Sequence, residues 1–228
     1  MKTLLSSVLV AMSFFVLSQV ANAKSFGAKL CKQPGYMCYV VKKGDTWATL
    51  FPDKEEREVV KRINRMNVGL YRGQTIALPA SGVVNDRMVY APFPAQIDPP
   101  GEKAVIVDIS DLAFGAYNAN GTLENWGPIS SGKGYCPDVG RRCGTPTGSY
   151  AIYTKQGAGC KSTKYPVGRG GAPMPYCMFF NGGFAMHGSP TVPGYNDSHG
   201  CVRLFTDDAK WLNQEFSDGD YVKVIIRR

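Results

Sequence analysis

Histidine is scarce in this sequence, which also has no long apolar segment and no block of like charge. His187 and His199 are the only imidazoles among 228 residues. The main apolar run, residues 4–16, is shorter than the roughly 20 residues that a membrane helix needs. Lysines and arginines outnumber acidic residues by 26 to 18 without forming a basic cluster. We therefore expect no membrane span and no nucleic-acid partner. The surplus positive charge suits an anionic partner such as cell wall, or ordinary solubility.

The N-terminus has the pattern of a secretory signal. Lys2 precedes the apolar run, and residues 21–23 form an Ala-x-Ala cleavage pattern. No lipid-attachment pattern surrounds Cys31. We therefore predict a signal peptide over residues 1–23 and an exported mature chain that begins with a leader over residues 24–38.

Cysteine, in contrast, is plentiful. Seven cysteines in an exported chain indicate oxidising conditions and leave one thiol over. We predict that six of them form disulfides between neighbours in the sequence, each across a loop rich in glycine and proline. Six cysteines allow many other pairings. The predicted pairs are Cys31–Cys38, Cys136–Cys143 and Cys160–Cys177. This scheme leaves Cys201 free, and a free thiol in an oxidising compartment is a liability unless it is used.

Residues 39–80 have the pattern of a small strand–helix–helix–strand unit. Residues 39–41 suit a strand, and Asp45 or Thr46 can cap a short helix after the turn. A capping box at residues 53–56 opens a second, amphipathic helix. A closing strand at residues 75–78 completes a unit that is small for an independent core.

A proline-rich linker over residues 81–101 separates this unit from a second domain, residues 102–228. Prolines favour extended, semi-rigid backbone. Beyond residue 102, short strand patterns alternate with turns, and one helix is predicted over residues 206–216. The predicted fold class is mainly β, a β-sandwich or open barrel with one helix, plus the small βααβ unit.

The residues that carry chemistry lie between His187 and Arg203. A Cys201 thiol becomes a nucleophile when an imidazole removes its proton, and both imidazoles are close in sequence. Gly200 permits a tight turn whose backbone amides could bind an oxyanion. Arg203 suits a substrate carboxylate. This set indicates acyl transfer through a thioester.

Three other interpretations of the same residues remain open. Cys201 could be a small buried residue with no chemical role. His187, His199 and Cys201 could bind zinc, although no fourth ligand is evident and the spacing is unusual. Cys201 could also be in a disulfide with another cysteine free. We predict no metal and no cofactor.

The unit at residues 39–80 resembles a LysM module. The similar segments are residues 40–47, 63–67 and 72–79, with Trp47 where that family usually has leucine. The resemblance implies binding to glycan strands that contain N-acetylglucosamine, such as peptidoglycan. The alternative is a LysM-like spacer with little affinity for glycan, since a fold does not guarantee a function.

The C-terminal domain resembles the L,D-transpeptidase (YkuD) family. His187-Gly188, the Ser-His-Gly-Cys-Val-Arg segment at residues 198–203 and the Thr-Pro-Thr-Gly turn within residues 144–148 carry the resemblance. It implies a YkuD-type fold and a periplasmic enzyme that acts on peptidoglycan stem peptides. A tetrapeptide stem would lose its terminal D-Ala, and the acyl group would pass to an amine, forming a 3-3 cross-link.

The resemblance also implies roles for individual residues. Cys201 would attack the carbonyl of the third stem residue, with His187 as general base, held in one tautomer by the Gly188 backbone. His199 would shape the site, and the amides of residues 199–201, including that of Gly200, would form the oxyanion hole. Substrate contacts are expected from three residues: Arg203, Ser198 and Gly188.

Other functions share parts of this pattern. The same site could transfer the acyl group to water, as an L,D-carboxypeptidase or a murein hydrolase. A papain-like or NlpC/P60 peptidase fits less well, because those families place the cysteine before the histidine. A non-catalytic wall-binding protein would need a degenerate site, whereas His187, His199, Cys201 and Arg203 are all present.

Overall fold

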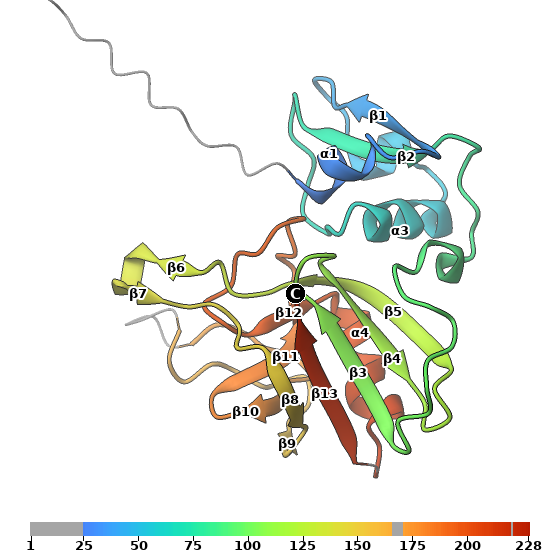
Figure 1. The fold of residues 1–228 in the computed structure, drawn as a ribbon. Coiled ribbons are helices and arrows are strands. Elements are labelled where there is room, and N and C mark those ends of the chain that lie inside the picture. The colour runs from blue at the N-terminus through green and yellow to red at the C-terminus, as the bar shows by residue number, and fades with distance from the viewer. Residues whose placement is uncertain (1–24, 166–170, 220) are drawn as a thin grey trace, which may run out of the picture.

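The protein has a small N-terminal module packed on one end of a larger β domain (Figure 1). A computed structural model describes residues 25–165, 171–219 and 221–228. The predicted signal peptide lies outside the described residues. In the described part of the chain, no helix is long and apolar enough to cross a membrane.

Apart from an additional helix at its start, the N-terminal module has the predicted order strand–helix–helix–strand. This additional helix and the first residues of the first strand fall within residues 24–38, which were predicted as a leader. The module consists of α1 (Phe26–Leu30), β1 (Tyr36–Val40), α2 (Trp47–Leu50), α3 (Lys54–Ile63) and β2 (Thr75–Pro79), and β1 pairs antiparallel with β2. Asp53 caps α3 through the Glu56 amide, but the reciprocal capping box occurs at Thr46 and Thr49 on α2. Trp47 is buried and donates Nε1–H to the Val68 carbonyl. The tryptophan therefore fills the module core and satisfies its own polar group.

The proline-rich segment was predicted as a linker, but the structure packs it against the β domain. It contains a short 3-10 helix, η1 (Arg87–Tyr90), and buries Phe93 in a cluster with Tyr117 and Trp126. Trp126 Nε1 donates to the Arg87 carbonyl at 2.7 Å. Tyr117 Oη donates to the Pro94 carbonyl at 2.8 Å. The segment is therefore a strap that fixes the module to the sheet rather than a free spacer.

The β domain is built on a curled sheet of nine strands (Figure 1). The strands are β3 (Lys103–Asp108), β4 (Ala113–Tyr117), β5 (Leu123–Ser130), β8 (Gly148–Ala151), β9 (Thr154–Lys155), β10 (Met178–Asn181), β11 (Phe184–Gly188), β12 (Val202–Leu204) and β13 (Val222–Arg227). Their order in the sheet is β8-β13-β3-β4-β5-β12-β11-β10-β9. This arrangement confirms the predicted mainly-β fold class.

A single helical segment covers the core side of the sheet. It consists of α4 (Thr206–Trp211) and a π-helical turn, η3 (Leu212–Phe216). Its apolar residues pack on buried strand residues such as Val105, Phe114 and Leu204. The predicted helix is confirmed. The N-cap is Phe205, however, and Thr206 is already helical, so no side chain caps this helix.

A disulfide-closed hairpin projects from the domain beside the sheet (Figure 1). It comprises β6 (Tyr135–Cys136), the 3-10 turn η2 (Pro137–Val139) and β7 (Arg141–Arg142). Sequence patterns did not predict it, because each strand has only two residues. All three predicted disulfides are present: Cys31–Cys38, Cys136–Cys143 and Cys160–Cys177. Cys201 is a free thiol, as predicted.

Candidate active site

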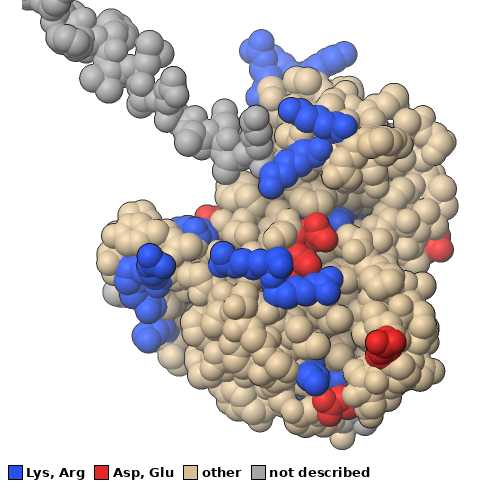
Figure 2. Space-filling view, in the orientation of Figure 1, with Lys and Arg blue, Asp and Glu red and all other residues tan. Residues whose placement is uncertain are grey.

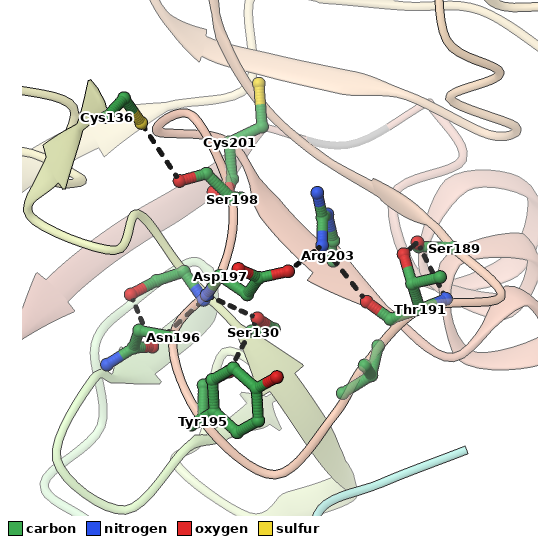
Figure 3. Close-up of polar contacts among 12 residues, drawn as sticks. Ser130, Cys136, Ser189, Thr191, Tyr195, Asn196, Asp197, Ser198, Cys201 and Arg203 are labelled. Atoms are coloured by element: carbon green, nitrogen blue, oxygen red, sulfur yellow. Dashed lines mark hydrogen bonds and ion pairs between the residues drawn. The ribbon is translucent and has the colours of Figure 1, made fainter. Parts of the chain in front are cut away.

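Two neighbouring parallel strands carry the catalytic candidates. β11 pairs with β12 so that His187 lies opposite Arg203 and Met186 opposite Val202. Directly opposed side chains of parallel strands share a face of the sheet, and so do residues two apart on one strand. Cys201, which immediately precedes β12, therefore lies on the same face as Arg203 and His187. Figure 3 shows the Cys201 thiol and the Arg203 guanidinium projecting to the same side of the chain.

The turn before Cys201 is organised by Ser198. The buried Ser198 hydroxyl accepts a hydrogen bond from the Gly200 amide at 3.0 Å and donates to the Cys201 carbonyl. Its backbone is fixed as well, since its amide donates to the Ser131 carbonyl at 2.9 Å. Ser198 was predicted to contact substrate. In this structure its hydroxyl is instead used inside the turn.

Gly200 occupies a position that other residues fit poorly. Its φ of +129° lies in the region that favours glycine, and a Cβ would come within 2.5 Å of the Phe184 ring. Its amide was predicted to bind the oxyanion, but this amide donates to Ser198. Its contribution to an oxyanion hole therefore stays a prediction, one that requires this hydrogen bond to open.

Thr145, in the Thr-Pro-Thr-Gly turn, secures the same segment from the other side. Its buried hydroxyl donates to the Gly200 carbonyl at 2.6 Å and accepts from the Gly132 amide at 2.9 Å. Sequence reasoning noticed the turn only through resemblance and assigned no role to Thr145. The structure makes this residue a bridge that holds the cysteine turn against the end of β5.

His187 is buried, and one of its ring nitrogens is hydrogen-bonded to the backbone. Its Nδ1 lies 2.9 Å from the Gly188 carbonyl. Because a carbonyl can only accept, Nδ1 carries the proton and Nε2 is left as the basic atom. Burial lowers the pKa of His187 to about 4. The Gly188 backbone thus fixes the tautomer. A side chain at Gly188 would meet Pro175 and Thr206, and the contact of Gly188 with substrate stays a prediction.

Cys201 is a neutral thiol in the resting site. Burial raises its pKa above the ordinary value, and the Ala185 amide and Arg203 oppose this effect. Its Sγ contacts the Gly183 carbonyl at 3.8 Å. Among the described residues, no hydrogen bond joins Sγ to His187, a loose arrangement that is common in sites without substrate. The pair therefore starts as thiol and neutral imidazole, not as an ion pair.

His199 points to the projecting hairpin instead of joining His187. Its Nε2 lies 2.6 Å from Asp138 Oδ2, and its ring stacks on Tyr165 with centroids 4.8 Å apart. The hydrogen bond to His199 lowers the pKa of Asp138. Sequence reasoning missed both partners. The only hint was that Asp138 lies within one disulfide-closed loop and Tyr165 within another.

The zinc alternative does not match this arrangement. Over the described residues, the one close group of three potential metal ligands is Cys136, Asp138 and His199. Cys136 is bonded to Cys143 and cannot offer a thiolate. The residues considered for zinc, His187, His199 and Cys201, do not form such a group among the described residues.

Arg203 is held loosely at the edge of the site. Its Nη1 donates to the Thr191 carbonyl at 3.3 Å and faces Asp197 Oδ2 at 3.4 Å (Figure 3). Asp197 is substantially exposed, so water screens this pair and it contributes little. A guanidinium with such weak partners can turn to a substrate carboxylate at small cost.

Basic side chains surround this region. Figure 2 shows Lys and Arg over the N-terminal module and over the lobe that holds β6 and β7. The exposed basic residues described in the two disulfide-closed loops are Arg141, Arg142, Lys161 and Lys164, and the exposed Lys133 lies just before the first loop. A large hollow of about 350 Å³ lies elsewhere, between the module and the β domain near Phe26 and Arg65, so it is not part of the cysteine site.

Comparison with known proteins agrees with this geometry. Residues 102–226 match the family model of the YkuD L,D-transpeptidase catalytic domain. An L,D-transpeptidase structure from Xylanimonas cellulosilytica is 25% identical with a TM-score of 0.54, covering 76% of this chain and 79% of that one. A Stackebrandtia nassauensis L,D-transpeptidase is 23% identical with a TM-score of 0.47, covering 77% and 68%. A Mycobacterium smegmatis L,D-transpeptidase is 23% identical with a TM-score of 0.44, covering 56% and 59%. The search of curated proteins found no match.

Proposed function

The chain belongs to the family of L,D-transpeptidase (YkuD) catalytic domains, whose members are cysteine-dependent acyltransferases, and we propose that this enzyme forms 3-3 cross-links between peptidoglycan stem peptides. The observation that carries the proposal is the single free thiol, Cys201, on the same sheet face as a buried neutral His187. The other cysteines of the described chain are locked in disulfides.

Acylation begins when the thiol reaches His187. Nε2 takes the proton from Sγ as sulfur attacks the carbonyl carbon of the third stem residue. The tetrahedral intermediate then collapses, the bond to D-Ala breaks, and His187 returns the proton to the departing amine. The product is a thioester on Cys201. His187 is again neutral, which its burial favours.

Transfer follows the same steps in reverse order. An amine from a neighbouring stem attacks the thioester, His187 takes the amine proton, and the proton returns to sulfur as the new amide forms. We assign stabilisation of the oxyanion to the backbone amides of residues 199–201, which requires the hydrogen bond between the Gly200 amide and Ser198 to open.

The acidic character of stem peptides supports this substrate class. The charge of Arg203 acts on the Cys201 thiol, and the present partners of Arg203 are weak. The basic rim on the two disulfide-closed loops adds attraction for carboxylates. We assign Arg203 to a carboxylate of the stem.

The N-terminal module and the predicted signal peptide support a proposal about where the enzyme works. A module that binds glycan strands would hold the enzyme on its polymer, and a cleaved signal over residues 1–23 would export it to the periplasm. Three disulfides suit an oxidising compartment.

The test combines covalent labelling with product analysis. The mature protein and Cys201→Ala are incubated with a carbapenem, which resembles the acyl donor, and intact masses are measured. An adduct on the wild type alone supports an acyl-accepting Cys201. Isolated murein is then treated with enzyme, digested and analysed for 3-3 dimers. Tripeptides without dimers would instead identify a carboxypeptidase, and absence of any adduct on folded, reduced protein would overturn the proposal.

A further inference from the structure

The N-terminal module is joined to the β domain by a buried ion pair. Arg62 on α3 donates two hydrogen bonds to the Asp208 carboxylate on α4, at 2.7 and 2.9 Å. Both side chains are almost completely buried. Gly127 lies against the pair, where a Cβ would come within 2.3 Å of Asp208 Oδ2. A module that served only to bind the polymer could be joined by a flexible linker and would not need a buried ion pair with the β domain.

The segment that follows α3 reaches the loop that joins His187-Gly188 to the turn before Cys201. Asn67 forms three hydrogen bonds with this loop, residues 189–197. Its amide donates to the Val192 carbonyl at 2.9 Å, its Oδ1 accepts from the Val192 amide at 2.8 Å, and its Nδ2 donates to the Ser189 carbonyl at 2.8 Å. Together these bonds satisfy Asn67 on both its backbone and its side chain.

Further contacts of the module fall on the same loop. Met66 forms an isolated antiparallel bridge with Pro193, and the Phe26 amide donates to the Gly194 carbonyl at 2.9 Å. Arg65 has a φ of +57°, an uncommon conformation for a residue with a side chain. Its guanidinium lies over the rings of Phe26 and Trp126, which fixes the backbone turn that directs Met66 and Asn67 to the loop.

The loop, in turn, holds the residue assigned to substrate binding. Its start follows His187-Gly188 and its end precedes the turn to Cys201. The Thr191 carbonyl and the Asp197 carboxylate are the two partners of Arg203 (Figure 3). Ser189 Oγ accepts from the Thr191 amide at 3.1 Å. The segment that Asn67 binds therefore supplies both of these contacts, which orient the Arg203 guanidinium before it turns to a substrate carboxylate.

We propose that the N-terminal module is a built-in part of the active site, in which Asn67 is a positioning residue that fixes loop 189–197 and, through it, Arg203. The module then affects the handling of stem peptides that carry no sugar, in addition to any glycan binding. This inference rests on the proposed function only in the role given to Arg203.

The test compares the full mature chain with Asn67→Ala and with Asn67→Asp, which keeps the acceptor for Val192 but loses the donor to Ser189. Asn85→Ala is the matched control, because Asn85 is exposed and outside this contact. The substrate is a synthetic tetrapeptide stem without glycan, followed by release of D-alanine. Alkylation of Cys201 by neutral iodoacetamide reports the nucleophile with a reagent that has no carboxylate for Arg203 to bind. Amide hydrogen exchange reports the loop.

Asn67→Ala is expected to raise KM for the tetrapeptide about tenfold with a smaller change in kcat, since small misplacements of binding groups weaken substrate positioning. Exchange in residues 189–197 becomes faster, and alkylation falls by a smaller factor than KM rises, since Arg203 affects the thiol only through its charge. Asn67→Asp has an effect in the same direction, because its carboxylate cannot donate to the Ser189 carbonyl, and this variant tests the inference if the alanine variant does not fold.

Unchanged KM and unchanged exchange in a folded Asn67 variant would overturn the inference. If the wild type releases no D-alanine, the proposed function fails, and hydrogen exchange alone then decides. If hydrogen exchange in residues 189–197 is faster only in the Asn67 variants, the module supports this loop. If exchange is equal in the wild type and the variants, the module does not support the loop, and the inference fails.

Discussion

Asp138 and His199 are 61 residues apart in the chain, yet their side chains meet at 2.6 Å. The disulfide between Cys136 and Cys143 closes the hairpin that carries Asp138. Tyr165, from the second disulfide-closed loop, stacks on the opposite side of the imidazole. The two loops therefore clamp the histidine of the Ser-His-Gly-Cys turn. This contact gives the disulfide-rich insertions a role beyond stabilising an exported domain.

Loss of the Asp138 carboxylate should slow acylation moderately. Asp138→Asn keeps the shape but weakens the hydrogen bond that orients His199, and exposed ion pairs are weak. We expect the rate of carbapenem acylation to fall roughly two- to fivefold while the melting temperature stays unchanged. Asp98→Asn, at an exposed site away from the cysteine, is the control. Equal rates in both variants would leave Asp138 without influence on the site.

The pH dependence of acylation should reflect the neutral His187. Burial lowers the pKa of this imidazole to about 4, so the base stays unprotonated at all higher pH. The rate is expected to be flat from about pH 5 to 8 and to fall below about pH 4 as the base takes a proton. Stopped-flow acylation with a carbapenem across this range measures it. An acidic limb near the ordinary histidine pKa of 6.5 would contradict the geometry.

The rate of alkylation by iodoacetamide reports the protonation state of Cys201, the partner of His187 in acylation. Because burial raises the pKa of Cys201, alkylation without substrate should be slow at neutral pH and should increase into the alkaline range. Fast alkylation at pH 6 would instead indicate a thiolate–imidazolium pair in the resting enzyme. Cys201→Ala shows the background from the reagent.

Local patterns explain why much of this fold could be predicted. The three disulfides each close a short loop, separated by 7, 7 and 17 residues, and the Asn181-Gly182 turn predicts the hairpin of β10 and β11. His187 and Cys201 were found because their residue types and order are specific to one chemistry. The hydrogen bonds of the Ser198 hydroxyl within its turn were less accessible, since a motif does not tell which polar groups are bonded locally.

Long-range contacts could not be predicted in this way. Arg62 and Asp208 are separated by 146 residues, and each belongs to an ordinary amphipathic helix pattern. Asn67 was noticed as the last residue of the segment 63–67 that resembles LysM, and asparagine is common in turns. Its hydrogen bonds to loop 189–197 depend on how two separately folded units dock, and no periodicity in either unit encodes that docking.

Breaking the buried ion pair should destabilise the whole chain. Arg62→Ala would leave the Asp208 carboxylate buried, with Arg87 only at 4.0 Å, and removing one partner of a buried pair costs about 3–5 kcal/mol. Urea unfolding of the mature protein measures the free energy. Lys61→Ala, which removes a partly exposed pair with Glu58 on the same helix, should cost about 0.5 kcal/mol or less. Similar losses in the two variants would mean that the docking contact carries little energy.

Adding a single methyl group at Gly200 should abolish most of the catalytic activity while the protein still folds. Alanine there would force a φ of +129° on a residue with a side chain and would place its Cβ within 2.5 Å of Phe184. The turn must shift, and the Cys201 thiol and the neighbouring amides shift with it. We expect acylation by a carbapenem to fall at least about a hundredfold, because displacements near 1 Å have effects of that size.

Gly73→Ala separates this effect from backbone strain alone. Gly73 also has a positive φ, +86°, but a Cβ there meets no atom within 4 Å. Both variants should lose about 1–3 kcal/mol of stability, since the strained backbone is similar, yet only Gly200→Ala should lose acylation. If Gly200→Ala reacts with a carbapenem at the wild-type rate, the turn does not position the nucleophile. The catalytic role of the segment between Ser198 and Cys201 would then have to be sought in substrate transfer rather than in acylation.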